Sequence, residues 1–323
     1  MAAATPLLMP LQEAIDKFIA WGVQRMQTEQ DDTKITAPLY HYTDGRALKG
    51  ILETGHVWFT DYRHMNDPSE LTHGMDMAYD FAERLSTGAD APVRSFLERF
   101  VALFRHRNFA GKLEFYIASF SRARDDLGQW RAYADNGRGF AIGFAPRLFD
   151  IVKPRPGRLP EFLGPVRYKV AEVLARHEAA LGEAVEIFSN AIDANAGLIG
   201  DTAILDQFID EFVREIIAQP LIWNCLTSKY PAYEHEQELR LMIMGAQKAL
   251  APHVTTRLRG RSEIVPYIDH PMSLREPHNI AEIVVGPAAH ADAERTLRTM
   301  VRSLRLDPDI IEVGRSDIPY RAL

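Results

Sequence analysis

The stretch Tyr233–Met244 constrains the fold most, because it combines an apolar alternation with closely spaced charges. Residues on successive strand positions point to opposite faces of a sheet. The stretch therefore predicts a strand that enters from a polar loop and carries its charges on one face, with its apolar residues on the other. The charged residues of that face are Glu236, Glu238 and Arg240.

Two carboxylates one strand repeat apart, Glu236 and Glu238, have two interpretations. On an exposed face they repel each other, and Arg240 neutralises one of them. Facing a cleft, they hold and polarise a substrate and accept a proton. This segment alone leaves both interpretations open.

A strand, helix and second strand are predicted over residues 39–60. Leu39–Asp44 forms the first strand, and the short helix Arg46–Thr54 ends at Gly55, which suits the left-handed position after a helix. His56–Thr60 forms the second strand. His41 lies on the first strand, on the face opposite to Tyr42, and such a histidine is either a hydrogen-bonded core residue or a functional group.

An apolar strand, Glu114–Ser121, ends in two hydroxyl residues on one face, Ser119 and Ser121. They either satisfy backbone groups at the strand end or line a site. A helix follows within residues 126–137, with a capping box at its start and Asn136-Gly137 at its end. Two glycines in the next strand, 139–144, indicate close approach of a ligand or another strand.

The remaining pattern predicts an α+β fold with a mixed or antiparallel sheet core and with inserted and flanking helices. Residues 1–37 form an N-terminal helical extension, whose helix at 11–29 serves as a lid or a homodimer element. Residues 38–323 form a single α+β domain. Two long helices, divided near 195–201, form an insertion at about 171–222. Strand, helix and strand recur between 281 and 313.

Composition narrows the class of protein. The chain has 323 residues, of which 46% are hydrophobic and 25% charged, as in a soluble globular protein. The net charge of −7 gives no global attraction to nucleic acid or to an anionic membrane.

Targeting and metal signals are weak. Cys225 is the single cysteine, which excludes an internal disulfide and a thiolate zinc site. The histidines lack a metal-binding spacing, so we expect no metal. We also expect no secretory signal, no membrane-spanning helix and a cytoplasmic location.

Four blocks resemble the bacterial family DUF2971 over most of residues 38–323. In order they are LYHYT with LKGILETGHVWFTDYRHMNDPSE, then ASFSRARDDLGQWRAYADNGRGFAIGF, then YEHEQELRLMI, then DIPYRAL. This family name implies no activity.

A second resemblance is to the ADP-ribosyltransferase superfamily, including its DarT-like members. It implies that His41 holds the nicotinamide ribose of NAD, that Ser119 and Ser121 support the nicotinamide pocket, and that a late Glu-x-Glu promotes transfer. His41 stands where the Ser-x-Ser class usually has arginine, and a long helical segment separates Ser121 from Glu236. An ADP-ribosyltransferase-like fold is implied as well.

In that chemistry a carboxylate beside the ribose stabilises an oxocarbenium-like state. Glu238 is the candidate for this role, and Glu236 for orienting or deprotonating the acceptor. Tyr42 or Trp58 would stack on nicotinamide, and Arg131 or Arg138 would meet the pyrophosphate.

The expected function is transfer of ADP-ribose from NAD to a protein or nucleic-acid acceptor, as a toxin or defence effector. Two alternatives stay open. The chain is a non-enzymatic nucleotide-sensing or interaction module, or it is an NAD glycohydrolase in which water is the acceptor.

Overall fold

The structure of the chain is a computed structural model that describes residues 6–65, 70–105, 113–150, 159–260, 262–306 and 310–322. It divides into two compact units. Unit 1 comprises Met1–Asp32, Asp67–Leu113 and Arg167–Pro231, and unit 2 comprises Thr33–Asn66, Glu114–Val166 and Ala232–Leu323.

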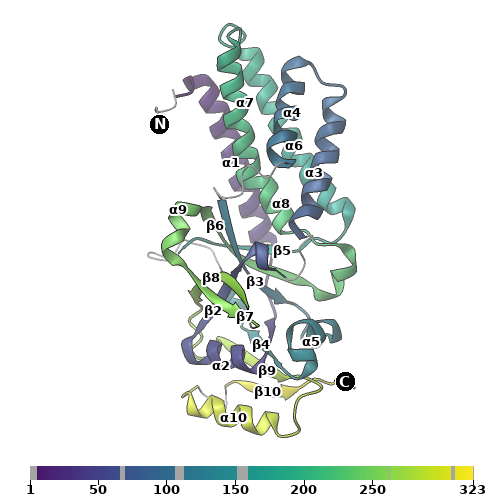
Figure 1. The fold of residues 1–323 in the computed structure, drawn as a ribbon, viewed down its shortest axis with the longest axis vertical. Helices are drawn as coiled ribbons and strands as arrows, with labels where there is room; N and C mark the ends of the chain where they lie inside the picture. Colours follow the sequence, from purple (N-terminus) through teal and green to yellow (C-terminus); the bar gives the residue numbers. More distant parts are fainter. Residues whose placement is uncertain are drawn as a thin grey trace. The chain divides into compact units, whose positions relative to one another are not determined.

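Unit 1 is a helical bundle in which the five longer helices run side by side (Figure 1). Its helices are α1 (Met9–Asp32), α3 (Glu70–Ser86), α4 (Ala91–Arg105), α6 (Val170–Ala194), α7 (Thr202–Ile216) and α8 (Ile222–Leu226). A π-helical segment, Ile217–Leu221, joins α7 to α8. The bundle thus gathers α1, from the predicted N-terminal extension, with α6 and α7, from the predicted insertion.

Aromatic rings fill the bundle core. Phe96 of α4 stacks on Phe188 of α6 with ring centroids 4.4 Å apart, and Phe188 stacks on Phe208 of α7 at 5.3 Å. Phe18 of α1 meets the edge of Phe212 at 5.3 Å. Each of these rings lies at a helical repeat, which is why the apolar spacing predicted helices here.

Unit 2 is built on a mixed sheet. The strands of its main path, in spatial order, are β10 (Glu312–Arg315), β9 (Ile280–Val285), β4 (Phe140–Phe144), β1 (Leu39–Thr43), β3 (Leu113–Ser121), β2 (His56–Asp61), β8 (Glu263–Pro271) and β7 (Val254–Arg259). Off this path, β6 (Glu238–Ala246) pairs with β3 and with β5 (Glu161–Pro165).

The pairs with described register are antiparallel, except for the parallel pair β9 and β10. The predicted α+β class with a mixed sheet and flanking helices is therefore confirmed. The helices of this unit are α2 (Gly45–Thr54), α5 (Leu127–Tyr133), α9 (Gln247–Leu250) and α10 (Ala293–Ser303), which lies against β10 (Figure 1).

Apolar side chains cover both faces of the sheet. The larger cluster joins Leu39, Phe120 and Leu239 of the strands to Leu48 of α2 and Leu297 of α10. The smaller cluster, on the other face, contains Tyr40, Tyr42, Trp130, Ala134, Ala141 and Val284. Alternation along β1, β3 and β6 thus decides which side chains enter each cluster.

Candidate functional site

Strand β3 has two edges but three strand partners, β1, β2 and β6, so at least two of them share one edge. β1 meets it at Ser121, opposite Tyr40, and β2 meets it at Ile117, opposite Thr60. Ser119, between these two positions, has no described pairing with β1 or β2. Its carbonyl group is therefore available to a side chain.

His41 occupies this position. Its Nδ1 lies 3.0 Å from the carbonyl oxygen of Ser119, and its ring contacts Phe120 with centroids 5.8 Å apart. Burial lowers the pKa of His41, and the positive charge of Arg257 lowers it further, against the effect of the Ser119 hydrogen bond.

The hydrogen bond also fixes the tautomer of His41. Because a carbonyl oxygen only accepts, Nδ1 carries the proton, and Nε2 of the neutral ring is then an acceptor. His41 is thus prepared to accept a hydrogen bond from a hydroxyl or amide group.

The two serines of β3 differ in their contacts. Ser121 Oγ donates to the carbonyl oxygen of Glu236 at 2.6 Å and accepts from the backbone N–H of Ala123 at 3.0 Å. Ser119 Oγ is buried and has no hydrogen-bond partner among the described residues. The hydroxyl of Ser121 binds the loop before β6, whereas the hydroxyl of Ser119 has no partner among the described residues and is available to a ligand.

These contacts link the three polar motifs of the sequence through main-chain carbonyl groups: His41 binds the backbone of Ser119, and Ser121 binds the backbone of Glu236. Leu239 of β6 and Phe120 of β3 enter the same apolar cluster. By alternation, Glu238 and the two serine hydroxyls therefore lie on the opposite face of the sheet, whereas His41, paired with Ile142 of that cluster, lies on the face of Phe120.

One part of the strand prediction is wrong. Glu236 ends a 3-10 helix, Pro231–Glu236, and the strand begins only at Glu238. Gln237, between them, has a φ of 44°, which breaks the extended backbone. Glu236 and Glu238 are therefore not successive positions on one strand face.

Each of the two carboxylates has its own partner. Tyr133 donates its hydroxyl to Glu236 Oε1 at 3.1 Å. Glu238 forms a two-pronged ion pair with Arg240, with N–O distances of 2.9 and 3.1 Å. All three charged residues are buried. Arg240 thus neutralises Glu238, as the first interpretation of this segment expected. The pair lies on a buried face of the sheet and not on an exposed one.

The two aromatic candidates have different surroundings. Tyr42 is 6% exposed, meets Trp130 edge to face at 4.8 Å, and donates its hydroxyl to the carbonyl oxygen of Ala123. Trp58 is 43% exposed and lies 4.7 Å from the ring of Tyr267. Trp58 is therefore the one of the two that a ligand reaches.

The basic candidates lie on the segment that follows β3. Arg131 is on α5, and Arg138 follows the turn that contains Asn136 and Gly137. Both side chains are exposed. No contact of the described residues joins either arginine to His41 or Ser119.

A different arginine acts electrostatically on His41. Arg257 of β7 lies over the Trp58 ring, with Cζ 4.9 Å from its centroid, and Nη2 is 3.4 Å from Thr60 Oγ1. The sequence prediction missed it. A signal was present in the alternation of VTTRLR before Gly260, which is typical of a hairpin strand. We name His41, Trp58, Thr60, Ser119 and Arg257 the β3 junction.

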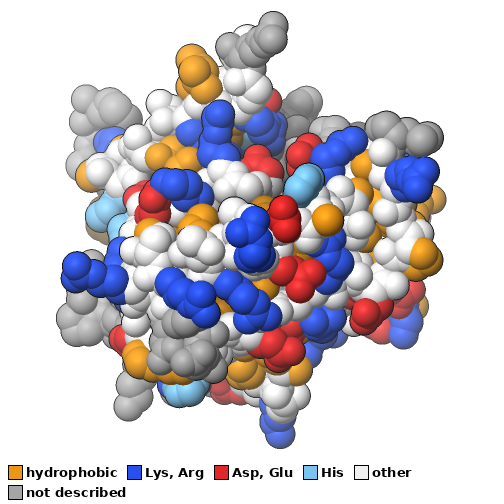
Figure 2. Space-filling model, turned by 90° about the horizontal axis from the view of Figure 1, so that it is seen from below, with side chains coloured by type: hydrophobic (Ala, Val, Ile, Leu, Met, Phe, Trp, Pro, Cys, Tyr) orange, Lys and Arg blue, Asp and Glu red, His pale blue; other side chains and the backbone are white. Residues whose placement is uncertain are grey.

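Figure 2 shows one face of the molecule, on which basic and acidic side chains are interspersed. On this face the charges do not form one broad positive patch. Within the described residues, no helix is long and apolar enough to cross a membrane.

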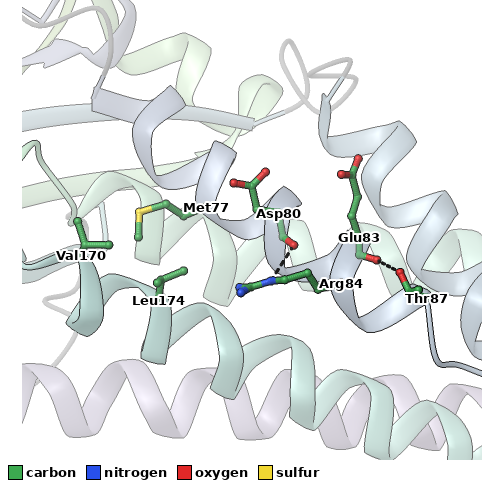
Figure 3. Close-up of a pocket in the computed structure, with 7 residues that line it drawn as sticks. All are labelled: Met77, Asp80, Glu83, Arg84, Thr87, Val170 and Leu174. Carbon is green, nitrogen blue, oxygen red and sulfur yellow. Dashed lines mark hydrogen bonds between the residues drawn. The ribbon is translucent and has the colours of Figure 1, made fainter.

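Unit 1 carries a pocket of about 640 Å³ between α3 and α6. Its lining residues are Met77, Asp80, Glu83, Arg84, Thr87, Val170 and Leu174 (Figure 3). Arg84 Nε donates to the carbonyl oxygen of Asp80, and Thr87 Oγ1 to that of Glu83. These two bonds return to the backbone of α3 and its end, so they serve the helix itself.

Comparison with known proteins gives a match to a family model. No curated protein and no solved structure matches the chain. The predicted family resemblance is confirmed for part of the sequence, which includes most of α5, the loop before β6 and the first part of β6. Residues 129–241 match the family model described as Protein of unknown function (DUF2971).

Proposed function

We propose that unit 2 binds NAD and cleaves its nicotinamide–ribose bond, transferring ADP-ribose to a protein or nucleic-acid acceptor. One observation carries the proposal: His41, the serines of β3 and the Glu236–Glu238 segment are joined by hydrogen bonds, although they are far apart in the sequence. Their residue types and order are those that led to the ADP-ribosyltransferase prediction. The proposed fold of unit 2 is accordingly ADP-ribosyltransferase-like.

The geometry supports specific roles in binding. His41 Nε2 accepts a hydrogen bond from a ribose hydroxyl, because Nδ1 is occupied by Ser119. Ser119 Oγ, which has no hydrogen-bond partner among the described residues, forms a hydrogen bond with the amide group of nicotinamide. Trp58, the exposed aromatic, stacks on the nicotinamide ring in preference to the enclosed Tyr42.

The chemical step requires stabilisation of positive charge on the ribose. Nicotinamide leaves with the electron pair of its bond to C1′, and the ribose becomes oxocarbenium-like. Glu238 supplies the negative charge, held in orientation by Arg240. The acceptor then attacks C1′ and loses a proton, for which Glu236 is the proposed base.

A second function is favoured by the Glu238–Arg240 ion pair. A buried pair of this kind also serves as a structural element, with no part in chemistry. In that case unit 2 binds a nucleotide without turnover, as a sensing or interaction module.

Glu238→Gln separates the two functions. The transferase proposal predicts that nicotinamide release falls about 100-fold or more while NAD binding persists. A structural role predicts that the melting temperature falls and that any release is unchanged in the folded fraction. Glu312→Gln, which changes an exposed glutamate on β10, is the matched control.

A glycohydrolase differs from a transferase only in the acceptor. Isotope-labelled NAD distinguishes them, since water as acceptor leaves all the label in free ADP-ribose. Label that moves into protein or nucleic acid of an added cell extract supports transfer.

A further inference from the structure

Three arginines gather near the ends of β2 and β7, and two of them have dedicated carboxylates. Arg259 binds Glu263 through Nε at 2.8 Å and Nη2 at 2.6 Å, and Arg63 binds Asp61 through Nε at 2.9 Å. Arg257 has no ion pair in the described part of the chain. Among the described residues it therefore has no carboxylate partner of the kind that neutralises each of its two neighbours.

The donors of Arg257 are also incompletely used. Nη2 makes one long contact, 3.4 Å, to Thr60 Oγ1, and Nε is buried without a partner among the described residues. Burial lowers the pKa of Arg257, and the charge of Arg259 adds to this effect. A partly buried cation without an ion-pair partner lowers the stability of the folded chain. An anion bound from outside the chain would recover that stability.

The guanidinium is nevertheless held in place. It lies over the Trp58 ring at 4.9 Å, and Tyr267 supports that ring from 4.7 Å. A cation–π contact uses the face of a guanidinium and not the N–H groups in its plane, which remain able to bind oxygen atoms. A planar fork of this kind matches phosphate better than it matches a single carbonyl group.

Further hydrogen-bonding groups face the same place. Thr60 pairs with Ile117 on β3, and Ser119 lies one strand repeat further on the same face. The hydroxyl of Ser119 is buried and unpartnered among the described residues. Asp44 and Glu263 act on Arg257 only from a distance, and Glu263 is bound to Arg259.

We propose that the β3 junction is a phosphate-binding site in which Arg257 is the ligand that carries the charge, with Thr60 and Ser119 as supporting hydroxyl groups. The inference rests on the proposed function in that the phosphate is then part of the diphosphate of NAD. It assigns this contact to an arginine of β7, and not to the exposed Arg131 or Arg138.

Calorimetric titration of the full chain with inorganic pyrophosphate, ADP-ribose and adenosine tests the proposal. For Arg257→Gln we expect binding of pyrophosphate and of ADP-ribose to weaken about 10- to 100-fold, with adenosine affected little. Arg257→Lys keeps the charge without the fork and is expected to lie between the two. Circular dichroism and a thermal melt establish that each variant is folded.

Arg259→Gln is the matched control, because it removes the same charge from the same strand face. We expect it to change pyrophosphate binding less than about threefold, since Arg259 is already neutralised by Glu263. Equal losses in both variants would reveal a general charge effect and overturn the proposal. Failure of the wild-type chain to bind any of the phosphate compounds would overturn it as well.

Turnover separates this inference from the proposed function. If pyrophosphate binds through Arg257 but NAD is not cleaved, the phosphate site stands and the transferase proposal fails. If NAD is cleaved and Arg257→Gln leaves its KM unchanged, the transferase proposal stands and the phosphate site fails.

Discussion

Nδ1 of His41 lies 3.0 Å from the carbonyl oxygen of Ser119, a residue 78 positions later in the chain. This single contact ties β1 to the part of β3 where pairing with β1 has ended. It also gives the imidazole a defined tautomer, with Nε2 left as an acceptor. A structural bond on one side of the ring therefore prepares the other side for a ligand.

Replacing His41 by alanine removes this bond and its acceptor. We expect the free energy of unfolding to fall by about 1 kcal/mol, because the carbonyl group of Ser119 loses its partner. NAD affinity is expected to fall about 10-fold. Denaturant unfolding and calorimetric titration measure the two effects. His253→Ala, at an exposed position of unit 2, is the control.

The pH dependence of stability follows from the lowered pKa of His41. Between that pKa and the ordinary value near 6.5, the unfolded chain binds more protons than the folded chain, so stability rises with pH there and is level above it. The contribution is lost as the pH falls through the folded pKa. His177, with a pKa lowered to about 3 chiefly by burial, acts in the same direction.

Urea unfolding at a series of pH values from about 5 to about 8 tests this sign. His41→Gln is expected to flatten part of the decline below pH 6.5, and the remainder belongs to His177 and other groups. A decline of unchanged steepness in the folded variant would show that His41 does not titrate as its surroundings indicate.

Gly74 permits the close packing of α3 on α8. A Cβ atom there would lie 2.8 Å from Cys225 Cα and 2.8 Å from Ser228 Oγ. Gly74→Ala is therefore expected to destabilise the chain by about 1 to 3 kcal/mol. At Gly182, within α6, an added Cβ atom would meet nothing within 4 Å, so Gly182→Ala should stabilise by about 0.5 to 1 kcal/mol. Thermal melts of both variants compare the opposite signs directly.

Asp125 anchors the C-terminal tail. Its carboxylate accepts from Trp130 Nε1 at 2.6 Å, Ser316 Oγ at 2.7 Å and the backbone N–H of Asp317 at 2.8 Å. Asp125→Ala is expected to cost about 2 kcal/mol and to expose the tail to proteolysis. Asp317→Ala, which keeps that backbone N–H, should leave both stability and tail cleavage near the wild-type values.

Local signals in the sequence predicted much of the fold. The helix that ends before Gly55 is present, and Gly55 has a φ of 75°, as a left-handed helix cap requires. Asp126 caps α5 by accepting from the backbone N–H of Gln129 at 2.8 Å. Short-range chemistry decides these features, so a single sequence contains enough information to predict them.

The candidate site was less accessible from the sequence. Alternation alone placed Glu236 on a strand, because no side-chain pattern announces the positive φ of Gln237. Arg257 was missed because it lies on a hairpin strand, and its lack of an ion pair among the described residues is a property of three-dimensional packing. Which strands meet β3, and where their pairing stops, depends on contacts between residues distant in the sequence.

Release of nicotinamide from NAD by the purified full chain, compared with folded Glu238→Gln, tests the central claim most directly. The transferase account predicts time-dependent release by the wild-type chain in the presence of cell extract, and a loss of about 100-fold or more in the variant. No release by the wild-type chain, or equal release by the two proteins, would contradict it.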